Sequence, residues 1–144
     1  MIFEDYSKKV TVFGFLSGLI VGQLMGIGIV LTTGLDIISG LTNGAGAGII
    51  VAMMPVQVLI KDWMTDKRLL VPFGMGWGTL VGILVGVVAS WSLGFQPLYG
   101  FSYGAIGGFV TGIVVCSILW FVSRDKGDSG DEDDEEELVE ISAE

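Results

Sequence analysis

Uncharged, strongly apolar stretches alternate along the chain with short polar connections. Four of them cover approximately residues 10–33, 37–60, 69–93 and 98–122, and each is about 24 residues long. At a rise of about 1.5 Å per residue, a helix of that length extends about 36 Å, enough to cross a hydrocarbon core about 30 Å thick. A glycine-rich soluble β protein would alternate polar and apolar residues along half-buried strands, and these stretches do not. The pattern therefore predicts four transmembrane α-helices.

Glycines recur at every fourth position inside all four stretches. In an α-helix four residues turn the chain by about 400°, so these glycines form a strip that drifts slowly around one face. A strip without side chains lets another helix backbone come close, which is a main source of helix association in lipid. The spacing leaves open whether that helix belongs to the same chain or to another copy. The predicted helix-packing residues are Gly14, Gly18, Gly22, Gly26, Gly40, Gly44, Gly48, Gly74, Gly78, Gly82, Gly86, Gly100, Gly104, Gly108 and Gly112.

The second half of the apolar region repeats the first. Residues 13–60 align without a gap on residues 73–120, and thirteen of the 48 positions are identical. Eight of the identities are glycine, whereas the glycine content of the two windows predicts about two by chance. We interpret this as a tandem duplication of a two-helix hairpin. Since each unit has an even number of spans, the repeats are parallel and related by an axis near the membrane normal.

Composition agrees with a membrane protein. Hydrophobic residues make up 51% of the 144 residues and charged residues only 16%, and there are 23 glycines. Soluble proteins carry about 25% charged residues and about 7% glycine. The predicted fold class is therefore an all-α integral membrane protein, with four transmembrane helices as two tandem parallel two-helix repeats packed through glycine ladders.

All seven basic residues fall on one side of the predicted membrane. They precede the first span, lie between the second and third, or follow the fourth, so the positive-inside bias places both termini in the cytoplasm, at the cell membrane. The predicted organisation is a cytoplasmic N-terminus (1–9), a first hairpin (10–60), a cytoplasmic loop (61–68), a second hairpin (69–123) and an acidic tail (124–144). The basic residues are Lys8, Lys9, Lys61, Lys67, Arg68, Arg124 and Lys126.

The polar residues in and beside the spans are few. The chain has no histidine and one cysteine, so the sequence predicts no catalytic residues, cofactor or metal, and we expect no enzyme. Gln23, Asp36 and Asn43 form a candidate polar site, whose counterparts sixty residues later are Ile83, Gln96 and Tyr103. They indicate either an outward-facing site or pore lining, or hydrogen bonds between helices. The sequence favours hydrogen bonding.

The chain ends in a strongly acidic segment. Residues 124–144 contain eleven acidic and two basic residues, which account for the whole net charge of −9. Such a segment cannot bury a core, and we expect it to be disordered. It would repel nucleic acid and could attract a basic cytoplasmic partner, or it could reflect adaptation to a high-salt cytoplasm in a halophile.

Two functions follow from these features. The leading expectation is a small non-enzymatic polytopic membrane protein that acts as an assembly or accessory subunit of a membrane complex. The alternative is a small oligomeric channel or transporter with a polar pathway near Gln23, Asp36 and Asn43. Both imply contact with membrane lipid and either homo-oligomers or a membrane-protein partner, without nucleic acid.

Overall fold

The computed structural model describes residues 2–34 and 36–124, with side chains from residue 5 onward. The acidic tail, for which we expect disorder and a basic partner, falls almost entirely on residues 125–144 and lies outside the described residues. The described chain forms four α-helices and one short 3₁₀-helix. They are α1 (Ile2–Thr33), α2 (Ile37–Ile60), η1 (Lys67–Leu69), α3 (Leu70–Ser92) and α4 (Pro97–Arg124).

All four α-helices are long and apolar enough to cross a membrane. The prediction of four long apolar helices is therefore confirmed. The bounds of α2 are those expected, and the bounds of α3 and α4 differ from the expected ones by one or two residues. The helix α1 begins well before its apolar stretch, because residues 2–9 contain no glycine or proline to stop a helix.

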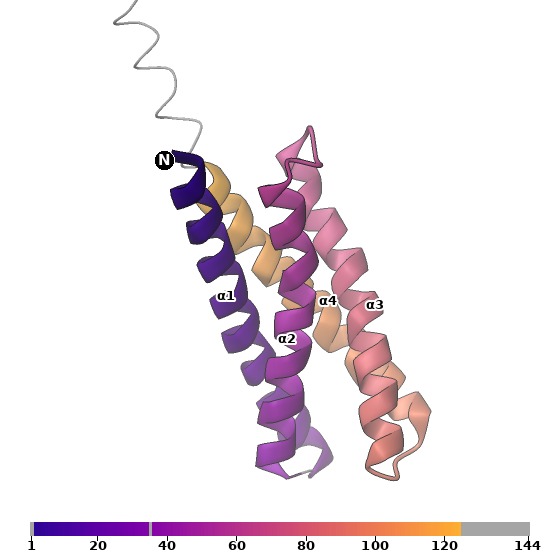
Figure 1. The fold of residues 1–144 in the computed structure, drawn as a ribbon. Helices are drawn as coiled ribbons and strands as arrows, with labels where there is room; N and C mark the ends of the chain where they lie inside the picture. The colour runs from indigo at the N-terminus through magenta and orange to yellow at the C-terminus, as the bar shows by residue number, and fades with distance from the viewer. Residues whose placement is uncertain (1, 35, 125–144) are drawn as a thin grey trace, which may run out of the picture.

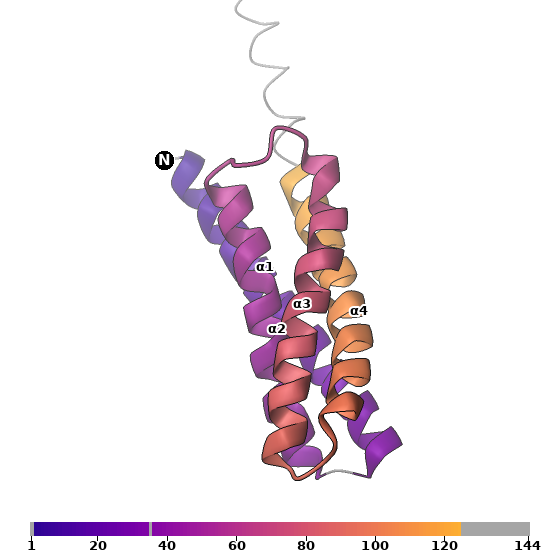
Figure 2. The same cartoon turned by 90° about the vertical axis from the view of Figure 1, so that its right-hand side faces the viewer.

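The helices form two antiparallel hairpins, α1–α2 and α3–α4, that lie side by side (Figure 1, Figure 2). Between the hairpins, α1 packs against α4, and α2 packs against both α3 and α4. We call one end of the bundle the terminal end. It holds the start of α1, the connection through η1 and the end of α4. We call the opposite end, which holds the two hairpin connections, the loop end.

Both hairpin connections turn at a glycine in the left-handed region. The φ angles of Gly34 and Gly94 are 70° and 75°, values that residues with a side chain rarely adopt. The Gly34 N–H donates to the carbonyl of Val30 at 2.8 Å, and the Gly94 N–H donates to the carbonyl of Trp91 at 3.1 Å. These bonds satisfy carbonyls left open where a helix ends. The two glycines are sixty residues apart, so the chain reverses at equivalent positions in both hairpins.

Within each hairpin the glycine-bearing faces of the two helices meet. A Cβ atom added to Gly22 would collide with the carbonyl oxygen of Gly44, and one added to Gly82 would collide with that of Gly104. Equivalent collisions recur along both hairpins, and the partners in one are always sixty residues from those in the other. The facing pairs are Gly18–Gly48, Gly22–Gly44, Gly26–Gly40, Gly78–Gly108, Gly82–Gly104 and Gly86–Gly100, with Gly14 against Val56 and Gly74 against Cys116.

The side-chain core lies toward the terminal end. There the two hairpins are held together by fully buried residues that include Val10, Leu70, Val115 and Leu119. The outer surfaces of the helices are apolar, with Leu31, Val88 and Phe121 among many exposed large side chains. Such a surface is expected of helices that face lipid rather than water.

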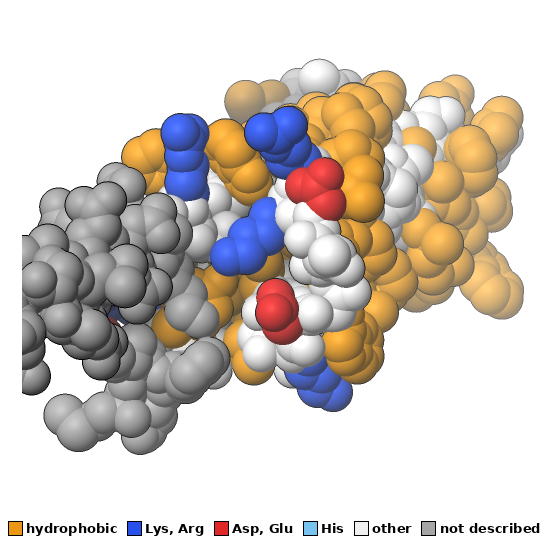
Figure 3. All heavy atoms as spheres, turned by 90° about the horizontal axis from the view of Figure 1, so that it is seen from above, with side chains coloured by type: hydrophobic (Ala, Val, Ile, Leu, Met, Phe, Trp, Pro, Cys, Tyr) orange, Lys and Arg blue, Asp and Glu red, His pale blue; other side chains and the backbone are white. Residues whose placement is uncertain are grey.

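Charged side chains gather at the terminal end, where Figure 3 shows basic and acidic groups beside the orange hydrophobic surface. Two basic groups lie over tryptophan rings: the Nζ of Lys61 is 4.8 Å from the ring centre of Trp63, and the guanidinium of Arg124 is 5.6 Å from that of Trp120. Tryptophan with neighbouring basic residues is typical of the membrane–water boundary. The ends of the helices thus carry the groups expected at an interface.

Candidate functional site

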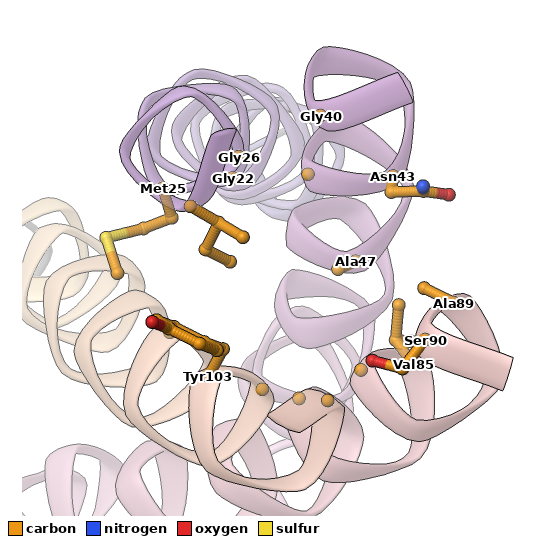
Figure 4. Close-up of a pocket in the computed structure, with 18 of the residues that line it drawn as sticks. Gly22, Met25, Gly26, Gly40, Asn43, Ala47, Val85, Ala89, Ser90 and Tyr103 are labelled. Atoms are coloured by element: carbon orange, nitrogen blue, oxygen red, sulfur yellow. The ribbon is translucent and has the colours of Figure 1, made fainter. Parts of the chain in front are cut away.

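A cavity of about 470 Å³ lies between the two hairpins, in the half of the bundle toward the loop end (Figure 4). All four α-helices line it, and it extends to the loop end, where Leu93, Phe95 and Tyr99 are exposed lining residues. We call it the central cavity. Its lining comprises Gly22, Met25, Gly26, Ile29, Val30, Thr32, Thr33, Ser39, Gly40, Asn43, Gly44, Ala47, Gly48, Val51, Gly82, Val85, Gly86, Ala89, Ser90, Leu93, Phe95, Tyr99, Gly100, Tyr103, Gly104, Gly107, Gly108 and Thr111.

The lining of the central cavity follows the sequence repeat. Apart from Thr32 and Phe95, every lining residue has its counterpart sixty positions away also in the lining, as with Val51 and Thr111. The cavity is therefore centred between two equivalent sets of positions. Toward the terminal end it is bounded by the buried side chains that pack the hairpins together, such as Leu119. The space is thus open toward one end of the bundle and closed toward the other.

The chemistry of the central cavity is apolar and uncharged. Every lining residue is uncharged, and most are glycine, aliphatic or aromatic. Three lining hydroxyls donate to backbone carbonyls of their own helix: Thr32 to Ile29 at 2.9 Å, Thr33 to Ile29 at 2.7 Å and Thr111 to Gly107 at 2.7 Å. These bonds satisfy the hydroxyl protons locally, so these threonines present mainly their methyl groups and oxygen lone pairs.

Four lining side chains keep unused hydrogen-bonding groups. Within the described ranges 2–34 and 36–124, no other residue makes a hydrogen bond with the side chains of Asn43, Ser90, Tyr99 and Tyr103. An asparagine amide carries two donors and an acceptor, and each hydroxyl is both donor and acceptor. In a setting without water such groups need a partner, because an unsatisfied polar group in an apolar medium raises the free energy. The cavity therefore combines an apolar body with a few polar groups free to bind a ligand, a combination typical of small-molecule sites.

The structure does not gather the three predicted polar-site residues around one space. Asn43 lines the central cavity, whereas Gln23 and Asp36 are not lining residues. Gln23 lies half-buried on α1, next to the ladder residue Gly22, and Asp36 is exposed at the start of α2. Two further polar residues of the lining, Ser90 and Tyr103, lie in the second hairpin. Each is sixty residues after a lining residue of the first hairpin, Val30 or Asn43. The repeat therefore relates them to the first hairpin, although their own polarity did not single them out.

Asp36 has a structural role as the N-cap of α2. Its carboxylate accepts a hydrogen bond from the backbone N–H of Ser39 at 3.1 Å, and its backbone is extended, as an N-cap requires. This bond satisfies one of the open donors at the start of the helix.

Replacing Asp36 by alanine is expected to lower the free energy of unfolding by about 1 kcal/mol, because the Ser39 N–H loses its acceptor. Asp36→Asn keeps the capping oxygen and should retain most of that stability. Unfolding of both variants in mixed micelles titrated with SDS measures the difference. If Asp36→Asn is as destabilised as Asp36→Ala, the charge matters more than the cap.

Within residues 2–34 and 36–124, no three His, Cys, Asp or Glu side chains lie close enough together to hold a metal ion. Comparison of the chain with protein-family models, with curated proteins and with solved structures found no match. The function must therefore be argued from the geometry of the bundle and its central cavity.

Proposed function

We propose that the chain is an integral protein of the cell membrane with both termini in the cytoplasm, formed by duplication of a hairpin that packs through its glycine ladders. Support for the duplication comes from the contacts of equivalent glycines, since Gly22 faces Gly44 as Gly82 faces Gly104. The orientation rests on the basic residues, and those in the described part of the chain fall at the terminal end. In this orientation the central cavity opens away from the cytoplasm.

We further propose that the protein is not an enzyme and binds a small molecule of low polarity in the central cavity. The observation that carries this proposal is the cavity itself, whose volume of about 470 Å³ lies within the range of roughly 300–1,000 Å³ typical of ligand pockets. The apolar, uncharged lining favours a ligand without charge. We favour a binding protein or carrier of this kind over a channel or transporter with a polar pathway near Gln23, Asp36 and Asn43, because only Asn43 of these three lines the cavity.

Filling the central cavity should abolish binding. Ala47 of α2 lines the cavity, and Ala47→Phe would place a phenyl ring in it; the matched control Ile50→Phe puts the same ring on the exposed face of α2, since Ile50 is 46% exposed. Native mass spectrometry of protein released from lipid nanodiscs measures the bound mass. We expect wild type and Ile50→Phe to retain a small-molecule adduct and Ala47→Phe to lose it. A wild-type protein released without any adduct would argue against the proposal.

The role of an assembly or accessory subunit is supported by a separate observation. Gly28, Gly46 and Gly76 lie on open surface, because a Cβ atom added to any of them would have no atom within 4 Å. Glycines on a lipid-facing surface let a further helix approach closely. Mass measurement of the protein purified in mild detergent tests this role, since one stoichiometric membrane-protein partner supports it and a strict monomer opposes it.

A further inference from the structure

The two sides of the central cavity differ although the repeat makes their positions equivalent. On the side between α1 and α4 stand three long side chains, Met25, Ile29 and Tyr103. The equivalent positions between α2 and α3 carry shorter ones, Val85, Ala89 and Asn43. Each replacement shortens the side chain, so all three act in the same direction. We call the first side the α1/α4 flank and the second the α2/α3 flank.

The α1/α4 flank is a wall. Outside it lies a separate crevice of about 160 Å³, whose lining shares Met25, Ile29 and Tyr103 with the central cavity. Side chains that line two separate spaces divide them. Met25 and Ile29 also pack over Gly107 of α4, where a Cβ atom would lie 3.7 Å and 3.9 Å from their terminal carbons. In Figure 4, Met25 and Tyr103 reach into the same side of the cavity from α1 and α4.

The α2/α3 flank lacks such a wall. Asn43 is exposed, and in Figure 4 its side chain points away from the middle of the cavity, toward the side where α2 and α3 approach each other. The short side chain of Ala89 lies opposite, on α3. Gly46, one turn along α2 from Asn43, has open space around it. The cavity is therefore least screened from the surrounding bilayer between α2 and α3.

We propose that the central cavity holds the apolar chain of a neutral single-chain amphiphile that enters from the bilayer between α2 and α3, with its polar head beside Asn43. This inference rests on the proposed binding function and adds the ligand class and its route. Asn43 lies seven residues after the N-cap of α2, about 10 Å from the start of the helix, a depth suited to a head group near the membrane boundary. Its amide has no partner among the described residues and can donate to and accept from a hydroxyl or ester. An uncharged lining suits a neutral head.

The repeat supplies the test variants. Asn43→Tyr gives the α2/α3 flank the ring that Tyr103 gives the α1/α4 flank. The double exchange of Asn43→Tyr with Tyr103→Asn moves the ring and the amide to the opposite flanks. Ala89→Ile, which installs the counterpart of Ile29, closes the α2/α3 flank without touching Asn43. Retained helicity and unchanged elution in detergent identify the variants that fold.

The probe is a monoacylglycerol with a photoreactive diazirine in its acyl chain, mixed into phosphatidylcholine vesicles that contain the full-length protein. In wild type we expect cross-links on cavity-lining residues. Asn43→Tyr and Ala89→Ile should lower the equilibrium cross-linking yield about tenfold, because the acyl chain of the probe can no longer lie across the α2/α3 flank. The double exchange should recover part of the yield, since it removes the ring of Tyr103 from the α1/α4 flank, where Met25 and Ile29 remain.

The outcomes separate this inference from the binding function. If wild type shows no cross-link to the cavity lining, the binding of an apolar chain in the cavity is wrong. If the lining is labelled and neither Asn43→Tyr nor Ala89→Ile changes the yield, the ligand does not lie across the α2/α3 flank, and only the route is overturned. Failure of the folded double exchange to recover labelling contradicts the claim that the shape of the flank decides access.

Discussion

Replacing Gly82 by alanine is expected to lower the free energy of unfolding by about 2 kcal/mol, the middle of the range for overpacked sites. A Cβ atom at this position would lie 2.7 Å from the Cα of Gly108 and closer still to the carbonyl oxygen of Gly104. Both neighbours are backbone atoms of α4, which cannot move aside as a side-chain tip can. The helices α3 and α4 would therefore have to separate, and contacts along the whole ladder would weaken together.

The control lies on the same helix. A Cβ atom added to Gly76 of α3 would have no atom within 4 Å, so Gly76→Ala meets no obstacle. Alanine favours a helix over glycine by about 1 kcal/mol, so this variant should be as stable as wild type or more so. Titration of each purified variant with SDS in mixed micelles, followed by circular dichroism, measures the free energy of unfolding. Equal stability of Gly82→Ala and Gly76→Ala would show that close backbone contact does not hold the hairpin together.

The helices follow from the sequence because hydropathy and length alone define an apolar span. Residues 37–60 became α2 with the expected bounds, since Asp36 caps its start and polar residues follow Ile60. Hydropathy predicts the apolar stretch of α1 but not where the helix starts, because a helix continues through polar residues until something stops it. Nothing in residues 2–9 does so.

The partner of each glycine ladder could not be read from its spacing. A repeat of four residues presents the same strip to any helix that approaches it, so Gly22 could have faced another copy. In the structure it faces Gly44 of the same hairpin. This leaves glycines outside the ladders, such as Gly46, as the ones open to a further helix.

The candidate site was predicted only in part, for a physical reason. Gln23, Asp36 and Asn43 were chosen by polarity and by depth along the helices, but depth does not say which way a side chain points. The central cavity lies between the two hairpins, so its lining depends on how all four helices pack against one another, which the spacing of residues along one helix does not predict. The repeat carried usable information, since Asn43 and its counterpart Tyr103 both line the cavity.

Replacing Leu119 by alanine should also destabilise the bundle strongly. Leu119 is fully buried among the side chains that join the hairpins at the terminal end. In soluble cores a leucine-to-alanine change lowers stability by about 2–5 kcal/mol, through lost transfer from water and through the space left behind. A membrane helix that separates keeps its leucine in lipid, so the transfer part largely disappears. What remains is lost packing, and we expect about 2 kcal/mol, the low end of that range.

Phe121 provides the control for Leu119, since it lies two residues further along α4 and is 73% exposed. Phe121→Ala should change the free energy of unfolding in the same SDS titration by less than about 0.5 kcal/mol. Because Leu119 lies outside the central cavity, Leu119→Ala should still bind the ligand that Ala47→Phe loses, provided that both are assayed below the unfolding transition. Loss of binding in Leu119→Ala would mean that the closed end sets the shape of the cavity. Retained binding would mean that the contacts between the hairpins around the cavity, such as those of Met25 and Ile29 with Gly107, keep it open without the full side-chain core at the terminal end.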